Sequence, residues 1–145
     1  MKRRRQTNIA AAAGVLGIGV DLTENERMRA TLKRWSTHFK DRVFRASEQT
    51  YCDSCAQAWR HYAGRFAVKE AVSKAFGTGI GDALNWLDIE VTRAASGAPA
   101  VALHGAGARL AQRRGVQKIL ISLSHTRHYA VAQALLVGAT NGDPA

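Results

Sequence analysis

The chain is poor in proline and cysteine and has no long apolar run. Only 2 of its 145 residues are proline and 2 are cysteine, while 46% are hydrophobic. This composition argues against a disordered chain and against a small scaffold held together by disulfides. No uncharged apolar stretch approaches the roughly 20 residues of a membrane-spanning helix. We therefore expect one globular domain with its own hydrophobic core and no membrane span.

The two cysteines form a single C-x-x-C pair. Cys52 and Cys55 have no second pair with which to build a zinc site, and no histidine lies at finger-like spacing. A redox-active pair is expected at the start of a helix after a strand, whereas these cysteines follow the polar residues 47–51. We therefore expect free thiols, as in a reducing cytoplasm.

Acidic side chains are scarce relative to basic ones. The chain has 21 Lys and Arg against 11 Asp and Glu, for a formal net charge of +10. Residues 2–5 supply four of the positive charges, which leaves +6 on the remainder. We therefore expect an acidic partner, and nucleic acid, an anionic membrane surface, a phosphorylated small molecule or an acidic protein would each fit.

Aromatic side chains are also few. They make up 7% of the residues and lie mostly within apolar patterns. No helix-turn-helix, zinc-finger or aromatic-stacking motif accompanies the basic charge. These absences weigh against a nucleic-acid-binding module, and we expect neither nucleic acid nor a membrane as the partner.

Hydrophobic periodicity predicts an α+β fold, with an antiparallel sheet packed on a long central helix. A buried first strand at 17–21 ends at Asp21, and Thr23 with Glu26 predicts a capping box for the next helix. The later elements are a short helical region at 41–52, a long helix at 56–76 ending at Gly77, a hairpin of 88–93 and 100–103, a helix at 106–114, and antiparallel strands at 118–124 and 129–137. We expect one domain at 14–138, between a flexible basic arm at 1–13 and a flexible tail at 139–145.

The segment 65–76 carries the clearest functional pattern. Its apolar stripe consists of Val68, Ala71, Val72, Ala75 and Phe76, and its polar face of Lys69, Glu70, Ser73 and Lys74. One explanation is a solvated helix face with a Glu70–Lys74 pair, worth about 0.2–0.5 kcal/mol. The other is a site for a metal ion and a phosphorylated ligand, in which a single carboxylate lies among cations.

Asp21 supplies a second carboxylate far away in the sequence. Together, Asp21 and Glu70 could hold Mg²⁺, which proteins bind through one or two carboxylates plus phosphate and water oxygens. Arg65, Lys69 and Lys74 could neutralise phosphate charge. The glycines of 77–81 would allow close backbone approach, although this run lacks the lysine of a P-loop and is a weak signal.

His125 follows the predicted strand at 118–124, where the chain turns. Ser122, Ser124 and Thr126 place hydroxyl groups nearby, but no G-x-S-x-G elbow occurs, so a catalytic triad is not expected. A lone histidine in such a position is more often structural than catalytic.

Five segments in the same order resemble the family of holo-acyl-carrier-protein synthases, the small stand-alone 4′-phosphopantetheinyl transferases. The segments are Gly-Ile-Gly-Val-Asp-Leu at 17–22, the helix and glycines at 64–81, Asp-Ile-Glu-Val at 88–91, Gly-Ala-Pro at 97–99 and Ser-Leu-Ser-His-Thr at 122–126. The resemblance extends over about residues 15–138. It implies a Mg²⁺-dependent transfer of 4′-phosphopantetheine from coenzyme A to a serine of an apo acyl carrier protein, a step that serves fatty acid biosynthesis.

The resemblance also implies roles for individual residues. Asp21 and Glu70 would bind the metal ion, and Lys74 would assist. The serine proton would be accepted by Glu70, by a water held by either acid, or by His125. The residues implied in coenzyme A binding are Arg65, Lys69, Ser73, Gly77, Gly79, Pro99, His125 and Thr126. Arg27, Arg29 and Arg34 of the basic first helix would dock the acidic carrier.

The family assembles as trimers with active sites between subunits, and the apolar strand at 129–137 is compatible with that assembly. Ala56 and Gln57 stand where family members can place basic residues for the 3′-phosphate of coenzyme A, and Arg60 is the nearest substitute. A scaffold that binds the carrier without catalysis is a further alternative. Intact Asp21, Glu70 and Lys74 argue against it.

Overall fold

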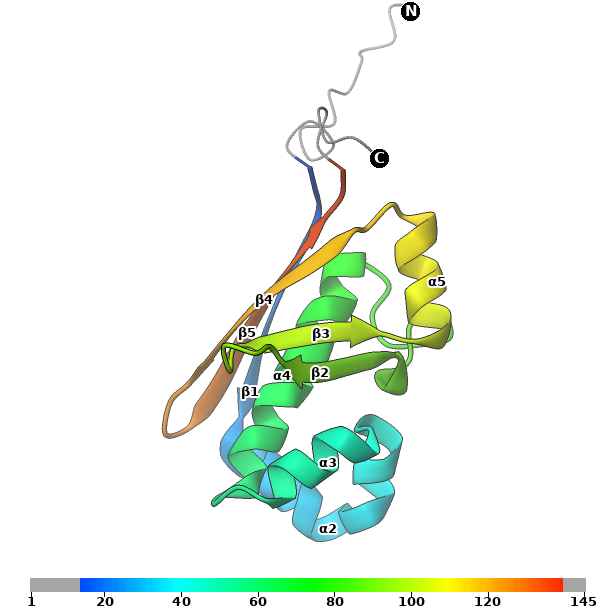
Figure 1. The fold of residues 1–145 in the computed structure, drawn as a ribbon. Coiled ribbons are helices and arrows are strands. Elements are labelled where there is room, and N and C mark those ends of the chain that lie inside the picture. Colours follow the sequence, from blue (N-terminus) through cyan, green and yellow to red (C-terminus); the bar gives the residue numbers. More distant parts are fainter. Residues whose placement is uncertain (1–13, 140–145) are drawn as a thin grey trace, which may run out of the picture.

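The computed structural model describes residues 14–139 and shows an α+β fold built around one helix (Figure 1). The helices are α2 (Asn25–Val43), α3 (Ala46–Asp53), α4 (Ala58–Phe76) and α5 (Gly105–Arg113), with a 3₁₀ turn η1 (Trp86–Asp88). The strands are β1 (Val15–Glu24), β2 (Ile89–Arg93), β3 (Pro99–Leu103), β4 (Lys118–His125) and β5 (Tyr129–Val137). The predicted arm at 1–13 and, beyond Ala139, the predicted tail lie outside the described residues.

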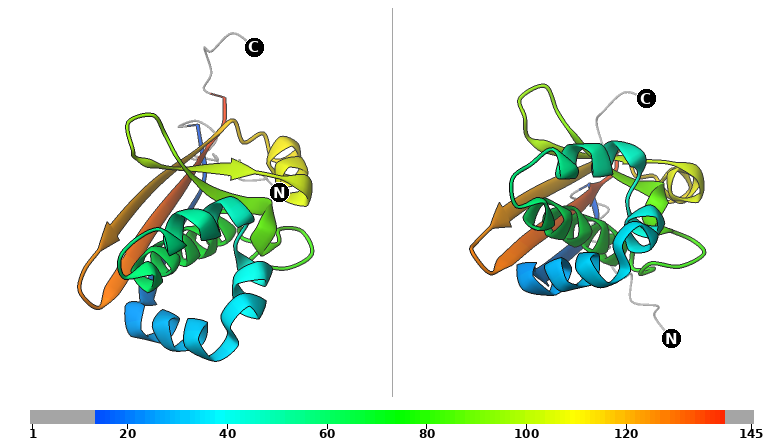
Figure 2. Two further views of the ribbon diagram at one scale, coloured as in Figure 1. Left: turned by 60° about the horizontal axis from the view of Figure 1, so that its bottom comes forward. Right: turned by 90° about the horizontal axis from the view of Figure 1, so that it is seen from below.

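Helix α4 forms the centre of the molecule. It packs along a three-stranded antiparallel sheet in the order β1-β5-β4, and the β2–β3 hairpin crosses it (Figure 1). Helices α2 and α3 lie beside its amino-terminal half (Figure 2). The helix ends at Gly77, whose φ of 74° is easily adopted only by glycine. The predicted central helix and antiparallel sheet are therefore confirmed.

The core lies between α4 and the sheet. Ala67, Val68, Ala71 and Val72 are fully buried and pack with alanines of β5. Burying each valine contributes about 1.5–3 kcal/mol. Small side chains on both sides allow the helix and the sheet to approach closely.

The closest approach is between α4 and β1. A Cβ atom added to Gly19 would lie 2.0 Å from the carbonyl oxygen of Ala71, and one added to Gly17 would lie 2.1 Å from that of Ala75. Only a residue without a side chain fits at these two positions. The alternation of glycine with aliphatic residues in β1 therefore fixes which face of the strand meets the helix.

Two expectations about the first third of the chain are wrong, and a third is confirmed in part. Strand β1 continues to Glu24, so Asp21 lies within it, and only one face of the strand is buried. Thr23 does not cap the next helix, because Glu24 occupies the N-cap position and no side-chain cap bond forms. The short helical region at 41–52 divides between the end of α2, which bends at Ser36 (φ 46°), and α3.

The second half follows the sequence pattern within two residues at each boundary. The β2–β3 hairpin, helix α5 and the antiparallel β4–β5 pair are all present. Among the described residues, none of the helices combines the length and apolarity that a membrane crossing requires.

Candidate active site

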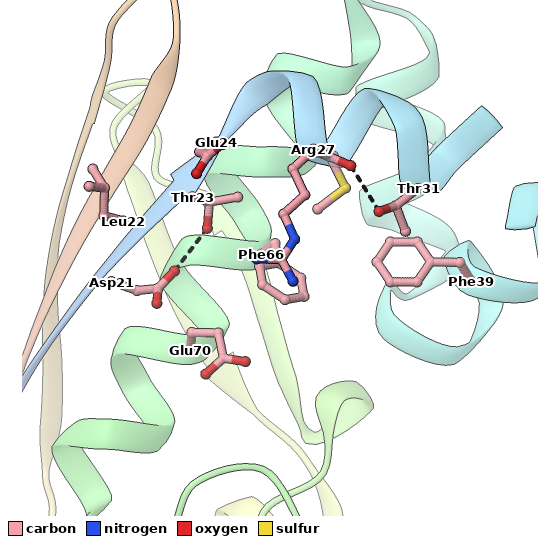
Figure 3. A pocket seen from close by; sticks show the side chains of 10 residues that line it. Asp21, Leu22, Thr23, Glu24, Arg27, Thr31, Phe39, Phe66 and Glu70 are labelled. Atoms are coloured by element: carbon pink, nitrogen blue, oxygen red, sulfur yellow. Dashed lines mark hydrogen bonds between the residues drawn. The ribbon is translucent and has the colours of Figure 1, made fainter. Parts of the chain in front are cut away.

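Asp21 and Glu70 line one cavity of about 510 Å³ (Figure 3). The cavity is bounded by β1, the first turns of α2, and α4. Its lining consists of Asp21, Leu22, Thr23, Glu24, Arg27, Met28, Thr31, Phe39, Phe66 and Glu70. The contact between Gly19 and Ala71 explains the arrangement, because Asp21 follows Gly19 on the same strand face and Glu70 precedes Ala71.

The carboxylate of Asp21 accepts hydrogen bonds at both oxygens. Thr23 Oγ1 donates to Oδ2 at 2.8 Å, and Lys74 Nζ donates to Oδ1 at 3.1 Å. Lys74 Nζ also donates to the carbonyl oxygen of Val20. Since the Lys74 side chain is half exposed, this ion pair contributes less than about 1 kcal/mol to stability.

Glu70 is half-buried. Burial raises the pKa of its carboxyl group, the negative charge of Asp21 raises it further, and Lys74 opposes both effects. Two carboxylates that repel each other at the wall of one cavity are suited to a hard divalent cation. In the part of the chain that the structure describes, no group of three or more His, Cys, Asp or Glu could hold a metal ion. A metal site here would thus rest on two carboxylates, a set that fits Mg²⁺.

The three arginines predicted to dock the carrier occupy different places on α2. Arg27 lines the cavity together with the two acids (Figure 3). The Arg29 guanidinium lies 4.5 Å from the ring centroid of Trp59, and that of Arg34 lies 5.0 Å from Trp35. Arg27 is therefore placed to act beside the acids, whereas the other two extend the basic surface.

The helical pattern predicts that Lys69 and Ser73 share a solvated face with Glu70 and Lys74. In the structure they do not. Both are fully buried. The three protons of the Lys69 ammonium group are directed at Glu48 Oε2 and at the carbonyl oxygens of Val43 and Trp86. Ser73 Oγ donates to the backbone carbonyl of Glu70. The donors of both side chains are engaged within the chain, and their contact with coenzyme A stays a prediction.

Arg65 belongs to a second cluster of basic and aromatic side chains. Its guanidinium lies 4.2 Å from the ring centroid of Tyr51, which also accepts a hydrogen bond from Arg93. The Nε atom of Arg65 is buried without a hydrogen-bond partner in the structure. His61 lies between Tyr51 and His125, at ring-centroid distances of 5.8 and 6.3 Å. The cluster concentrates positive charge and hydrogen-bond donors, as an anion site requires.

The turn at His125 and Thr126 is fixed by residues that sequence reasoning did not single out for that role. Asn25, which is buried, donates from Nδ2 to the carbonyl oxygens of Thr126 and Arg127. Arg60 Nη2 donates to the carbonyl oxygen of Thr126 at 2.9 Å. A Cβ atom on Gly64 would lie 2.6 Å from His125 Cε1, so the imidazole lies directly against α4.

Of the predicted site residues, only Asp21, Glu70 and Arg27 line the cavity. Gly77 and Gly79 lie in the turn after α4, with φ values of 74° and 64°. Pro99 begins β3 opposite Arg93. The predicted coenzyme A ligands therefore form groups separate from the two acids within one copy of the chain.

Comparison with known proteins identifies the family. The model of the 4′-phosphopantetheinyl transferase superfamily matches residues 17–134. The holo-[acyl-carrier-protein] synthase of Protochlamydia amoebophila is 45% identical over 120 residues, which cover 83% of this chain and 96% of the relative.

Solved structures share the fold. The holo-[acyl-carrier-protein] synthase of Neisseria meningitidis superposes with a TM-score of 0.79 at 26% identity and covers 84% of this chain and 98% of that one. The Helicobacter pylori holo-[acyl-carrier-protein] synthase in complex with coenzyme A has a TM-score of 0.74 at 31% identity, covering 82% of this chain and 98% of that one. Sequence and fold agree over most of the length, and the chain belongs to the 4′-phosphopantetheinyl transferase superfamily, among the holo-[acyl-carrier-protein] synthases.

Proposed function

We propose that this chain transfers 4′-phosphopantetheine from coenzyme A to a serine hydroxyl of an apo acyl carrier protein. A bond forms between the serine oxygen and the phosphorus of the phosphopantetheine, and adenosine 3′,5′-bisphosphate leaves. The observation that carries the proposal is the cavity in which β1 and α4 bring Asp21 and Glu70 together beside Lys74. It occurs in a chain 45% identical to a holo-[acyl-carrier-protein] synthase.

Asp21 and Glu70 are the residues that would hold Mg²⁺. Their oxygens are the hard donors that this ion prefers, and the mutual repulsion that raises the pKa of Glu70 is what a divalent cation would relieve. The ion would withdraw charge from the pyrophosphate and help to align it for attack.

The protein's own groups supply positioning, positive charge and a proton acceptor. Lys74 places an ammonium group beside Asp21, where it can also face a phosphate oxygen. Glu70, or a water held by Glu70 or Asp21, accepts the proton of the serine hydroxyl. Arg27, in the same cavity, faces the acidic surface that a carrier protein would bring to the site.

The cluster around Arg65 is the part of the chain suited to the nucleotide end of coenzyme A. Arg60, Arg65, His125 and Thr126 gather cations and donors there. The roles of Gly77, Gly79 and Pro99 in binding coenzyme A rest on the resemblance to the family. The contacts predicted for Lys69 and Ser73 also rest on the resemblance, since the donors of both side chains are engaged in hydrogen bonds within the chain.

Assembly into a trimer is part of this proposal. The outer face of β1 exposes Ile18, Val20 and Leu22 at 61%, 57% and 62%, a row of aliphatic side chains that a neighbouring subunit could cover. Strand β5, which the sequence made compatible with such an assembly, is the central strand, and its alanines are buried against α4. Contact between copies could bring the Arg65 cluster of one subunit to the acids of another. Sedimentation velocity on the full chain and on Val20→Asp tests the assembly.

One experiment tests the activity. The protein is incubated with coenzyme A, Mg²⁺ and an apo acyl carrier protein, and the carrier is weighed by mass spectrometry. We expect a mass gain of one phosphopantetheine, absent when the carrier serine is replaced by alanine. No mass gain with several carriers, together with salt-sensitive binding of nucleic acid, would instead support a nucleic-acid-binding module.

We place the reaction in the cytoplasm, a compartment in which the free thiols of Cys52 and Cys55 are expected.

A further inference from the structure

Thr23 lies on the same inward face of β1 as Asp21 (Figure 3). Its Oγ1 donates a hydrogen bond of 2.8 Å to Asp21 Oδ2, and the residue is only 8% exposed. The neighbouring helix does not use this hydroxyl, since Glu24 is the N-cap residue and makes no side-chain cap bond. The hydroxyl proton of a buried threonine is thus directed at a carboxylate.

The strand holds both partners of this bond in place. Asp21 pairs with Ala132 and Thr23 with Ala130 of β5, so the two Cα positions are fixed by the sheet. A threonine in a strand is also restricted at χ1, because its Cβ atom is branched. Hydrogen bonds to an ionised acceptor are stronger than those between neutral groups. The hydroxyl is therefore a rigid and strong constraint on the orientation of the Asp21 carboxylate.

The other oxygen of Asp21 is held from a different element. Lys74 Nζ, on α4, lies 3.1 Å from Oδ1. Two donors thus act on the two oxygens, and each oxygen keeps lone-pair capacity for a further ligand. In metal sites, partners of this kind orient the ligating carboxylates, and their loss typically lowers metal affinity by about 10–100-fold.

We propose that Thr23 is a positioning residue, which fixes the Asp21 carboxylate as a ligand for the divalent cation shared with Glu70. The inference rests on the proposed function, in which these two acids hold Mg²⁺. Thr23 acts through Asp21 and does not itself contact the substrates.

The test is direct binding of Mn²⁺, used as a paramagnetic substitute for Mg²⁺, to the full chain, followed by electron paramagnetic resonance. Thr23→Val keeps the shape and the branched Cβ but removes the hydroxyl, and we expect about 10–100-fold weaker binding. Thr23→Ser keeps the hydroxyl and should restore most of the affinity. Thr31→Val is the matched control, because Thr31 lines the same cavity but donates to the carbonyl oxygen of Arg27. It should bind Mn²⁺ as the unaltered chain does.

A second readout separates positioning from general damage. The Mg²⁺ concentration that half-saturates carrier modification should rise for Thr23→Val, while kcat at saturating Mg²⁺ is largely retained. If Thr23→Val fails to fold in a thermal melt, Thr23→Ala supplies the hydroxyl-free variant.

Three results would overturn the inference: unchanged Mn²⁺ affinity in the hydroxyl-free variant, equal loss in Thr23→Ser, or no Mn²⁺ binding by the unaltered chain. The Mn²⁺ assay contains neither coenzyme A nor carrier, so its outcome is independent of whether a carrier is modified. A chain that binds Mn²⁺ through Thr23-oriented Asp21 but modifies no carrier would refute only the proposed function.

Discussion

Lys69 Nζ lies 2.8 Å from Glu48 Oε2, and both side chains are completely shielded from solvent. Burial lowers the pKa of Lys69, and the charge of Glu48 opposes this shift. Glu48 also accepts hydrogen bonds from the backbone N–H groups of Arg45 and Val91. Through these bonds Glu48 connects α3 to α4 and to β2. Lys69, its partner on α4, directly precedes Glu70 in the sequence.

Removing one member of this pair should be costly. Lys69→Met leaves the Glu48 carboxylate buried without its counter-charge, and we expect the free energy of unfolding to fall by about 3–5 kcal/mol. Urea denaturation followed by circular dichroism measures the loss. Lys74→Met is the matched control: its ion pair is half exposed, so stability should fall by less than about 1 kcal/mol while transfer is lost. Equal stability losses in the two variants would contradict the distinction between a structural and a functional lysine.

Glu70→Gln should abolish transfer without harming the fold. The amide cannot accept the serine proton, and loss of a general base alone costs about 10²–10⁴-fold in rate. Stability should stay the same or rise, because the substitution removes the repulsion with Asp21. Carrier mass over time gives the rate, and a thermal melt reports the fold. A fully active variant would remove Glu70 from the mechanism.

Gly19→Ala should disrupt the contact between β1 and α4. The new Cβ atom would lie 2.0 Å from the carbonyl oxygen of Ala71, which the helix cannot easily move. We expect a loss in the free energy of unfolding of at least about 3 kcal/mol, the upper part of the usual range for overpacking. Gly81→Ala is the control, since nothing lies within 4 Å of its added Cβ. A mild effect at Gly19 would show that β1 can separate from α4 at little cost.

Acidification should destabilise the protein through its histidine cluster. Burial lowers the pKa of His125 below its usual value of 6.5, and the positive charges of His61, Arg60 and Arg65 lower it further. The unfolded chain, with an ordinary histidine pKa, binds more protons at mildly acidic pH, so the free energy of unfolding falls as the pH drops through about 6.5. Urea denaturation from pH 7 to about 5.5 checks this, and His125→Gln should flatten the slope. An unchanged slope would assign the effect to other groups.

Arg27→Glu should weaken the binding of the carrier protein more than the binding of coenzyme A. Reversing a charge beside Asp21 and Glu70 repels an acidic partner at the cavity, so KM for the carrier should rise by one to two orders of magnitude, about 1.4 kcal/mol for each. Arg34→Glu, on the part of α2 near Trp35, should have the smaller effect. Steady-state kinetics with each substrate varied in turn distinguishes the two. Equal loss for carrier and coenzyme A would contradict a docking role.

Local patterns predict most of the elements because each is marked by residues close together in sequence. Gly77 ends α4 where a left-handed residue is required, and the apolar run 129–137 predicts β5. Asp21 and Glu70 stand out locally for the same reason, as an acid at the end of a predicted buried strand and an acid on the basic face of the central helix. The structure brings both acids to one cavity, and their shared role as metal ligands stays a prediction.

Tertiary partners explain what the local pattern missed. Lys69 and Lys74 look alike on a helical projection, and only Glu48, on another helix, determines that one is buried and the other half exposed. Thr23 has the sequence signature of a helix N-cap, but pairing in the sheet extends β1 beyond it to Glu24. Asn25 gives no local signal of its contact with the turn at Thr126, more than one hundred residues away.

The two faces of β1 have opposite requirements, and they alternate residue by residue. Gly17, Gly19 and Asp21 face α4, whereas Ile18, Val20 and Leu22 face outward. Insertion or deletion of a single residue in this strand would exchange the faces. Aliphatic side chains would then be directed at the backbone of α4, where only glycine fits, and the aspartate would be directed away from Glu70. The length of this segment is therefore constrained as tightly as its composition.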